Sequence, residues 1–367
     1  MGPVAIIGVG LMGGSLGLAL RSRAGARDIR GYDPDAGAVR AGLERGAITH
    51  GCATADEAVG GAAAVFVATP VGMIAGLARQ ALAASPADCV VSDVGSSKGS
   101  VLAQLSAVER ERFIGGHPVC GSERGGVEHA REDLFVGATY FLTPAAETRP
   151  ELFERLHGIV AATGARPSAI DPDVHDRLMA LVSHLPHVIA SALIHQAAAT
   201  APQGREALRS AGPSFTDLTR VAGANPPLWA DILLANRDAV IREIEDQAQR
   251  LGTVVAALAA GDRDWLESFM RDAAVGRARL REAEPEVLPE PWRVVVAMPN
   301  RPGVISDIAT ILGHAHINIE DLSLRSGAGA DEGELSVVVT GHAVAERAAD
   351  LVTQRGYDAR LEPVIAQ

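Results

Sequence analysis

Short apolar runs and longer amphipathic runs alternate along the first part of the chain. The apolar runs have the length and β-branched content of buried strands, and they lie at Val4–Gly8, Ile29–Asp33, Val65–Thr69, Cys89–Val94 and Phe113–Gly115. Helical stretches such as Gly13–Arg23 separate them. Because this alternation is typical of strand–helix–strand units, we expect residues 1–167 to form an α/β domain with a doubly wound parallel sheet.

From about Ser168 the strand patterns end, and several segments carry apolar residues at three- and four-residue spacing, which is typical of amphipathic helices. We expect helices at Val174–Ala199, Gly204–Ala211, Pro213–Ala222, Leu228–Gly252 and Asp262–Glu284. Long helices with this much apolar surface need something to pack on. Residues 168–284 are therefore predicted to form an all-helical domain that also buries a partner chain, in a homodimer.

The last part of the chain has a pattern of its own. Glu282–Pro291 is rich in proline and glutamate, which is the composition of a linker. Beyond it the pattern predicts strand, helix, strand, strand, helix and strand, with the first four at Trp292–Met298, Val304–His314, Ile317–Arg325 and Glu334–Thr340. This βαββαβ order predicts a ferredoxin-like domain over residues 292–367.

Composition and charge exclude several classes of function. The net charge of -12 disfavours a nucleic-acid binder, which needs a clustered basic surface. Three separated cysteines, with no CxxC pair, suit a reducing compartment and give neither a disulfide framework nor a zinc site. Ala58–Ala78 carries no charge over about a membrane-spanning length, but glycines and a proline interrupt it, and Ala64–Ala68 fits a buried strand better. We expect a cytoplasmic protein with no signal peptide and no membrane partner.

A GxGxxG pattern follows the first predicted strand and opens a helix. Gly8 permits a tight turn, Gly10 lets a pyrophosphate approach the backbone, and Gly13 allows close helix–strand packing. The helix N-terminus then offers unpaired N–H donors to phosphate. This context predicts the dinucleotide site of a Rossmann domain, with a glycine-rich turn that binds nothing as the alternative.

Asp33 ends the second strand, 25 positions after Gly8. A carboxylate there accepts from the ribose hydroxyls of NAD and repels the additional phosphate of NADP. The alternative is that Asp33 only forms a turn before Pro34. We expect NAD as the cofactor.

Polar residues follow two later strands. Ser96 lies in SDVGSSKG (residues 92–99), where hydroxyls cluster before a helix, and a plain N-cap is the alternative. His117 lies in GGHPVCGSE (residues 115–123), is held extended by Pro118, and falls at the carboxyl edge of the sheet, where ligands bind. A catalytic role for His117 is favoured over a structural one. A nucleophilic Cys120 is a weaker alternative.

The helical segment adds two polar groups. SHLPH contains His184 and His187, but no third ligand has usable spacing, so no metal site is predicted. In DLTR, Asp217 and Arg220 fall on the same side of a helix, and a surface ion pair is the plain interpretation. Trp229 is core or interface by default.

Taken together, these motifs resemble the prephenate/arogenate dehydrogenases that carry a C-terminal ACT domain. The resemblance covers nearly the whole chain, through GVGLMGGSLG, Gly31–Asp33, VATPV, SDVGSSKG, GGHPVCGSERGG, SHLPH and DLTRVAGANPPLW. It implies NAD-dependent oxidative decarboxylation of prephenate to 4-hydroxyphenylpyruvate in tyrosine biosynthesis, or of arogenate to tyrosine. It also implies that the NAD site is formed by Gly8, Gly10, Leu11, Met12, Gly13, Asp33, Thr69 and Pro70.

The same resemblance assigns roles to the polar residues. His117 would hydrogen-bond the C4 hydroxyl of the ring as hydride leaves C4 for the nicotinamide, with Ser96 supporting it. Arg220 would grip a substrate carboxylate, for which a guanidinium is well shaped. The remaining contacts would come from Glu123 and His187 lining the pocket, Asp217 orienting Arg220, and Trp229 approaching from the partner subunit.

The terminal domain resembles an ACT module, whose first strand–helix turn can bind an amino acid. Asn300, Gly303 and Asn318 are the expected effector contacts, with tyrosine as a feedback ligand. A stabilising or dimerising appendage is the alternative. Two other functions stay in view: a β-hydroxyacid dehydrogenase, whose catalytic lysine pattern we do not find, and an inactive NAD and amino-acid sensor. The sequence does not decide between prephenate and arogenate.

Overall fold

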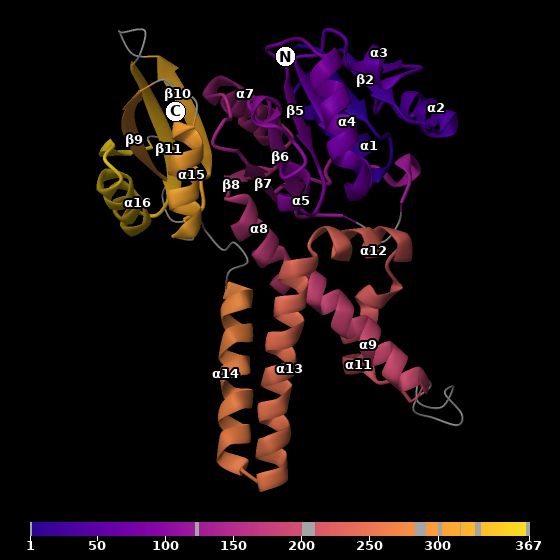
Figure 1. Cartoon of the computed structure of the whole chain (residues 1–367), viewed down its shortest axis with the longest axis vertical. Coiled ribbons are helices and arrows are strands. Elements are labelled where there is room, and N and C mark those ends of the chain that lie inside the picture. Colours follow the sequence, from indigo (N-terminus) through magenta and orange to yellow (C-terminus); the bar gives the residue numbers. More distant parts are fainter. Residues whose placement is uncertain are drawn as a thin grey trace.

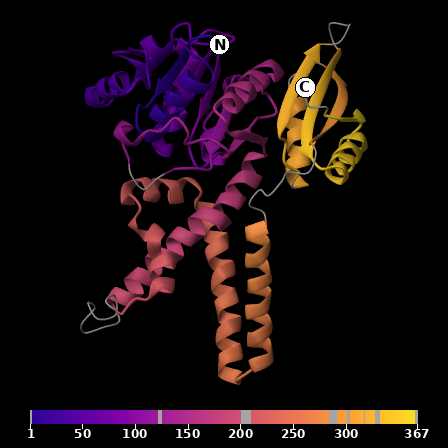
Figure 2. The same ribbon diagram turned by 180° about the vertical axis from the view of Figure 1, so that it is seen from behind.

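The computed structural model describes residues 2–121, 125–199, 210–282, 291–299, 303–315, 317–326 and 332–364. Three parts are distinct in Figure 1: a large sheet-containing part with the N-terminus, a small sheet-containing part beside it, and long helices that project away from both. The same three parts are seen from behind in Figure 2.

The large sheet has the strand order β3-β2-β1-β4-β5-β6-β7-β8. Its strands are β1 (Val4–Ile7), β2 (Ile29–Tyr32), β3 (His50–Gly51), β4 (Ala64–Val67), β5 (Val90–Asp93), β6 (Phe113–Pro118), β7 (Thr139–Thr143) and β8 (Arg166–Ala169). Strands β1 to β6 are parallel, in the doubly wound Rossmann order. β7 runs antiparallel to β6, and β8 runs parallel to β7. The α/β fold class is confirmed, with a mixed edge in addition.

Helices cover both faces of this sheet. They are α1 (Leu11–Arg23), α2 (Ala36–Glu44), α3 (Ala55–Val59), α4 (Val71–Ala84), α5 (Gly99–Leu102), α6 (Ala107–Arg110), η1 (Val127–His129) and α7 (Pro150–Ala162). Side chains of β1 alternate between the faces, so Val4 and Ile6 join the core under α1, while Ala5 and Ile7 join the core under α4. Within the uncharged run at Ala58–Ala78, the buried strand predicted at Ala64–Ala68 is confirmed as β4, between α3 and α4.

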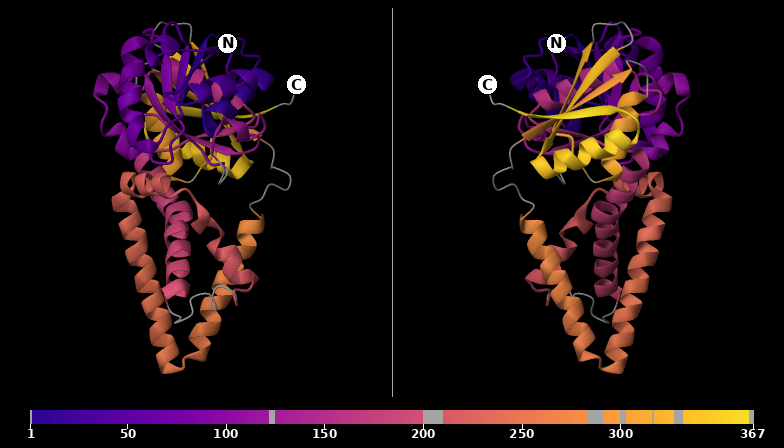
Figure 3. Two further views of the ribbon diagram at one scale, coloured as in Figure 1. Left: turned by 90° about the vertical axis from the view of Figure 1, so that its right-hand side faces the viewer. Right: turned by 90° about the vertical axis from the view of Figure 1, so that its left-hand side faces the viewer.

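The helical part contains α8 (Pro172–Met179), η2 (Ala180–His184), α9 (Leu185–Ala199), α11 (Pro213–Thr219), η3 (Arg220–Gly223), α12 (Pro226–Ala235), α13 (Arg237–Ala260) and α14 (Arg263–Glu282). In Figure 3, α13 and α14 form a hairpin that extends away from both sheets. The predicted helix at Gly204–Ala211 falls almost entirely outside the described residues.

One predicted helix is wrong in its extent. Leu228–Gly252 was expected to be continuous, but α12 ends and α13 begins at Asn236, whose φ and ψ of -113° and 27° are not helical. The Asn236 side chain is buried, and its amide donates to the carbonyl of Asp176 at 2.7 Å. That buried hydrogen bond replaces helix continuation at this position.

The helix from Pro172 to Ala199 is long and apolar enough to cross a membrane, judged by length and composition only, with a mean hydropathy of 1.5. Its most apolar window is only 28% buried within the chain. A helix that packs in the core of a soluble protein passes the same test, so this is weak evidence for a membrane span. Within the helix, η2 is a π-helical segment, a distortion found often at functional sites.

The small sheet has the order β10-β11-β9-β12 and is antiparallel throughout. It is built from β9 (Pro291–Pro299), α15 (Val304–His314), β10 (Asp321–Ser326), β11 (Glu332–Thr340), α16 (His342–Gln354) and β12 (Asp358–Pro363), which confirms the βαββαβ prediction. This part packs on the Rossmann domain. Ser306 donates to the carbonyl of Pro144 at 3.2 Å, and His157 of α7 lies 3.8 Å from Asp321.

Candidate active site

A cleft of about 410 Å³ opens where the carboxyl ends of the parallel strands meet the helical part. Five of the predicted NAD contacts line it, together with both predicted catalytic residues and one predicted substrate contact: Gly10, Leu11, Met12, Thr69, Pro70, Ser96, His117 and Trp229. Residues far apart in the sequence are therefore brought to one site.

The glycine turn has the geometry that a dinucleotide requires. Gly8 has a φ of +98°, and a Cβ there would lie 2.3 Å from the carbonyl oxygen of Ala68. A Cβ on Gly13 would lie 2.0 Å from the carbonyl oxygen of Gly8, so α1 packs tightly on the turn. At Gly10 a Cβ would meet no described atom within 4 Å, which leaves the space into which a pyrophosphate fits. The N-terminus of α1 begins immediately after this opening.

Two further residues adjoin the turn. Thr69 Oγ1 is buried with no hydrogen-bond partner among the described residues, and Thr69 lines the cleft. The Asp33 carboxylate accepts from the backbone N–H groups of Val9 at 2.8 Å and Asp35 at 2.9 Å. Asp33 thus stabilises its own turn and also ties the end of β2 to the glycine turn.

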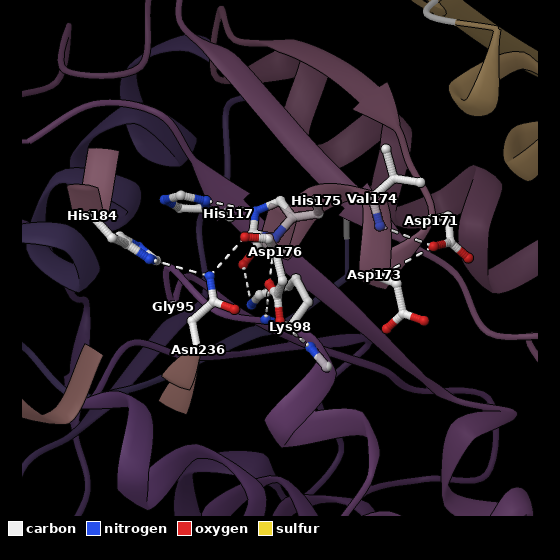
Figure 4. Close-up of polar contacts among 12 residues, drawn as sticks. Gly95, Lys98, His117, Asp171, Asp173, Val174, His175, Asp176, His184 and Asn236 are labelled. Atoms are coloured by element: carbon white, nitrogen blue, oxygen red, sulfur yellow. Dashed lines mark hydrogen bonds and ion pairs between the residues drawn. The ribbon is translucent and has the colours of Figure 1, made fainter. Parts of the chain in front are cut away.

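His117 lies near the carboxyl end of β6 and is half-buried. Its Nδ1 is 2.8 Å from Nε2 of His175, a residue of α8 that has no exposed surface. The other ring nitrogen of His175 lies 2.8 Å from Asp176 Oδ1. Figure 4 shows His117 in contact with His175, and Asp176 next to His175.

Asp176 is held by the loop that carries Ser96. Its two carboxylate oxygens accept from the backbone N–H groups of Lys98 and Gly99, each at 2.8 Å. Asn236 donates to the Asp176 carbonyl and lies 3.2 Å from Nδ1 of His184, as Figure 4 also shows. The loop, α8 and the junction of α12 with α13 therefore meet at one residue, Asp176.

A buried ion pair lies beneath His117. Lys98 and Asp93 have no exposed side-chain surface and are hydrogen-bonded to each other. The Lys98 ammonium also donates to the carbonyl of Gly116 at 2.7 Å, while Asp93 accepts from the backbone N–H groups of Gly95 and Gly116 at 2.9 Å. Burial lowers the pKa of Lys98, against the opposing effect of Asp93.

The pKa of His117 lies well below the ordinary histidine value. Burial is the largest cause, because it disfavours the charged imidazolium. Nearby His175, Lys98 and His184 lower the pKa further, since a positive charge on any of them would repel a charged His117. His117 is therefore neutral at pH 7 and able to accept a proton. Its only described hydrogen-bond partner at Nδ1 is a histidine, so Nε2 is the nitrogen available for a ligand.

The helical wall of the cleft is aromatic. His187 stacks on Trp229 with ring centroids 3.4 Å apart, and His184 meets Trp229 edge-on at 6.0 Å. Burial lowers the pKa of His184 to about 4. Because α12 packs against α4, Trp229 lines the cleft of its own chain. Its approach to the site of a partner subunit stays a prediction.

The other predicted substrate contacts lie near this wall. Arg220 is exposed at the end of α11. Burial lowers the pKa of His187, and the charge of Arg220 adds to that effect. Asp217 is exposed one turn earlier on α11. Glu123 lies outside the described residues. Neither Arg220 nor His187 borders the cleft around His117 directly.

Family models match all three parts of the chain. The nucleotide-binding domain of prephenate dehydrogenase matches residues 16–168, the dimerization domain of prephenate dehydrogenase matches 171–272, and the ACT domain matches 292–356. Prephenate dehydrogenase of Bacillus subtilis is 31% identical over 324 residues, which cover 88% of this chain and 87% of that protein. The chain belongs to the prephenate dehydrogenase family.

Solved structures agree with this assignment. The crystal structure of prephenate dehydrogenase from Aquifex aeolicus, in complex with hydroxyphenyl propionate and NAD+, has a TM-score of 0.72 and 28% identity, and the match covers 76% of this chain and 98% of that one. Synechocystis arogenate dehydrogenase has a TM-score of 0.68 and 27% identity, covering 76% and 99%. This member of the prephenate dehydrogenase family is an NAD-dependent oxidoreductase.

Sequence reasoning missed several residues of this dehydrogenase's site. They are the buried groups behind His117, namely Asp93, Lys98, His175, Asp176 and Asn236. The available signal was the adjacent His175–Asp176 pair at the start of a helix, since charged or polar pairs on an otherwise apolar helix face are uncommon in a core unless they are hydrogen-bonded.

Two of the predicted effector residues, Gly303 and Asn318, lie at the junction between the ACT domain and the Rossmann domain. Gly303 caps α15 with a φ of +93°, and a Cβ there would lie 2.7 Å from the carbonyl oxygen of Ala146. Asn318 donates to Glu320 at 2.6 Å and borders a cavity between the two domains. Asn300 lies outside the described residues.

Proposed function

We propose that this enzyme oxidatively decarboxylates prephenate to 4-hydroxyphenylpyruvate in tyrosine biosynthesis. The observation that carries the proposal is the position of a neutral, half-buried His117 in the same cleft as the dinucleotide turn. A neutral imidazole next to a hydride acceptor is what the oxidation of a ring alcohol requires. The names of the Bacillus subtilis and Aquifex aeolicus relatives support prephenate as the substrate.

His117 is the proposed general base, through Nε2, for the C4 hydroxyl of the cyclohexadiene ring, and Ser96 on the facing loop supports that hydroxyl and the imidazole. Bound NAD supplies the hydride acceptor. We assign its pyrophosphate to Gly8, Gly10, Leu11, Met12 and Gly13, its ribose to Asp33, and the nicotinamide side to Thr69 and Pro70. The ring carboxylate leaves as CO2 while the ring becomes aromatic.

Arg220 is the proposed cation for a substrate carboxylate. We assign Arg220, which begins η3, to the side of the site where His187 stacks on Trp229, and we assign Asp217 of α11 to orient it. An exposed Arg220 in the single chain suits a site whose outer wall is completed when the substrate or a second subunit covers it. Glu123 is assigned to the pocket by its place in the GSE motif.

We also propose a cytoplasmic homodimer that forms through the helical part. Large apolar side chains are exposed along α12, α13 and α14: Leu228, Leu234, Ile241, Ile244, Leu251, Val255, Leu258, Phe269, Met270, Val275 and Leu280. An apolar surface of this extent is typical of an obligate interface. We divide the chain into residues 1–167, 168–284 and 292–367, and assign tyrosine as the feedback ligand of the third unit.

The alternative substrate is arogenate, which differs from prephenate by an amino group in place of the side-chain keto group. The similarity to Synechocystis arogenate dehydrogenase supports this alternative. Steady-state NADH formation is measured at 340 nm with NAD and each substrate in turn. We expect a higher kcat/KM with prephenate, and near-complete loss of kcat in His117→Asn. If neither substrate yields NADH with the wild-type enzyme, the proposal is refuted.

A further inference from the structure

The three side chains behind the cleft form a directed hydrogen-bond chain, from His117 to His175 to Asp176. We propose that His175, held by Asp176, is a positioning residue that fixes the proton of His117 on Nδ1 and so keeps Nε2 bare toward the substrate hydroxyl. The proposal rests on the proposed function of His117 as a base. It assigns a role to a residue that never touches the substrate.

The proton positions follow from the last member of the chain. The pKa of Asp176 is lowered by hydrogen bonds from His175 and from the backbone N–H groups of Lys98 and Gly99, against its own burial, so Asp176 is ionised and can only accept. The His175 nitrogen that faces Asp176, Nδ1, must therefore carry a proton.

Burial lowers the pKa of His175, so its ring is neutral, and a neutral imidazole with a proton on Nδ1 has an unprotonated Nε2. That nitrogen faces Nδ1 of His117 at 2.8 Å. Two unprotonated nitrogens at this distance would repel each other, so His117 carries its proton on Nδ1 and donates it. The lone pair of His117 then lies on Nε2.

The packing around His175 prevents its ring from turning and so exchanging the nitrogens that face His117 and Asp176. His175 has no exposed surface, and Phe141 of β7 meets its ring edge-on, with centroids 5.5 Å apart. Asp176 is held by two backbone donors from the Ser96–Gly99 loop, so the carboxylate cannot turn without breaking both. Asp176 thus holds the Ser96–Gly99 loop and the His175 ring in fixed positions relative to each other, which preorganises His117 as a base.

The charged and titratable groups around the hydrogen-bonded His117, His175 and Asp176 determine how readily His117 carries a positive charge. Lys98 and Asp93 approach from the end of β5, and His184 approaches from η2. When His117 accepts the hydroxyl proton on Nε2, its Nδ1–H still donates to His175 Nε2, so the new positive charge keeps its hydrogen bond. Burial and the Lys98 ammonium disfavour that charge, so the proton is then readily released to solvent.

The matched variants are His175→Gln and His175→Asn. A glutamine amide oxygen can reach the position of Nε2 and accept from His117, whereas asparagine is too short and reaches only the position of Nδ1. We expect His175→Asn to lose about 100-fold in kcat, the low end of what a positioned base contributes, with the KM for NAD unchanged. His175→Gln should recover kcat to within about tenfold of the wild type, because acceptance alone is needed. His50→Asn, an exposed histidine in β3, is the control and should match the wild type.

A second measurement does not depend on turnover. In the wild-type holoenzyme labelled with ¹⁵N-histidine, the ¹⁵N shifts of His117 should report a protonated Nδ1 and an unprotonated Nε2, and His175→Asn should show both tautomers. A wild-type His117 protonated on Nε2, or an asparagine variant as active as the glutamine variant, would overturn the proposal. If the wild-type enzyme oxidises neither prephenate nor arogenate, the proposed function fails, while the ¹⁵N shifts still decide the tautomer.

Discussion

Lys98→Met would leave the buried Asp93 carboxylate without its ammonium partner. Removing one member of a fully buried ion pair costs about 3–5 kcal/mol, because the remaining charge is stranded. Asp93 keeps the backbone donors of Gly95 and Gly116, so we expect the free energy of unfolding to fall by about 3 kcal/mol. For a domain of this size that corresponds to a fall in Tm of about 10 °C.

The assay is thermal unfolding of the enzyme without NAD, followed by circular dichroism, for Lys98→Met, Asp93→Asn and the double variant. Asp93→Asn removes the charge and keeps an oxygen for one of the backbone donors. The double variant should therefore be more stable than the sum of the single losses predicts, by about 1–3 kcal/mol. A loss below about 1 kcal/mol in Lys98→Met, or strictly additive losses, would show that the pair is not the buried electrostatic unit that the distances indicate.

Four further outcomes are expected. Because the pKa of His117 is lowered and only its neutral form accepts a proton, kcat/KM should stay constant down through about pH 6.5 and fall only at lower pH, and an acid limb centred at or above 6.5 would contradict this. Gly10→Ala should keep the wild-type Tm and weaken NAD binding in calorimetry, because its Cβ meets no described atom. Gly13→Ala should lower the Tm as well as the affinity for NAD, because its Cβ meets the backbone of Gly8. The same Tm in the two variants would refute the packing argument. Asp33→Asn should weaken NAD binding and reduce the preference for NAD over NADP. Unchanged affinities for both dinucleotides would show that Asp33 does not bind the ribose. Arg220→Ala should weaken substrate binding by about 2 kcal/mol, seen as a raised KM with little change in kcat, and an unaltered KM would exclude the carboxylate role.

Local patterns predicted most of the fold and one half of the site. The GxGxxG turn, the alternation of strands and helices, and the βαββαβ order each depend on neighbouring residues, so sequence alone locates them. His117 and Ser96 could be placed in one cleft because the carboxyl ends of parallel strands meet at one edge of a sheet.

The buried half of the site could not be predicted. Lys98 and Asp176 are 78 positions apart, and Asn236 is a further 60 away, so no spacing rule joins them. The break at Asn236 shows the same difficulty, because helical periodicity continues across it and only a tertiary hydrogen bond reveals why the helix stops. The position of Trp229 depends on how α12 folds back onto α4, which a linear pattern does not record.

The ACT domain shares its interior with the catalytic domain. Ser306 and Gly303 contact the Pro144–Ala146 segment that directly follows β7, and β7 carries the Phe141 ring that lies against His175. A shift of the ACT domain would therefore reach the His175 ring through a single strand, β7. Truncation after α14 would expose apolar side chains of the Rossmann domain that now share a core with the ACT domain. Loss of activity in a shortened enzyme would therefore have to be separated from loss of solubility before it is taken as an effect on regulation.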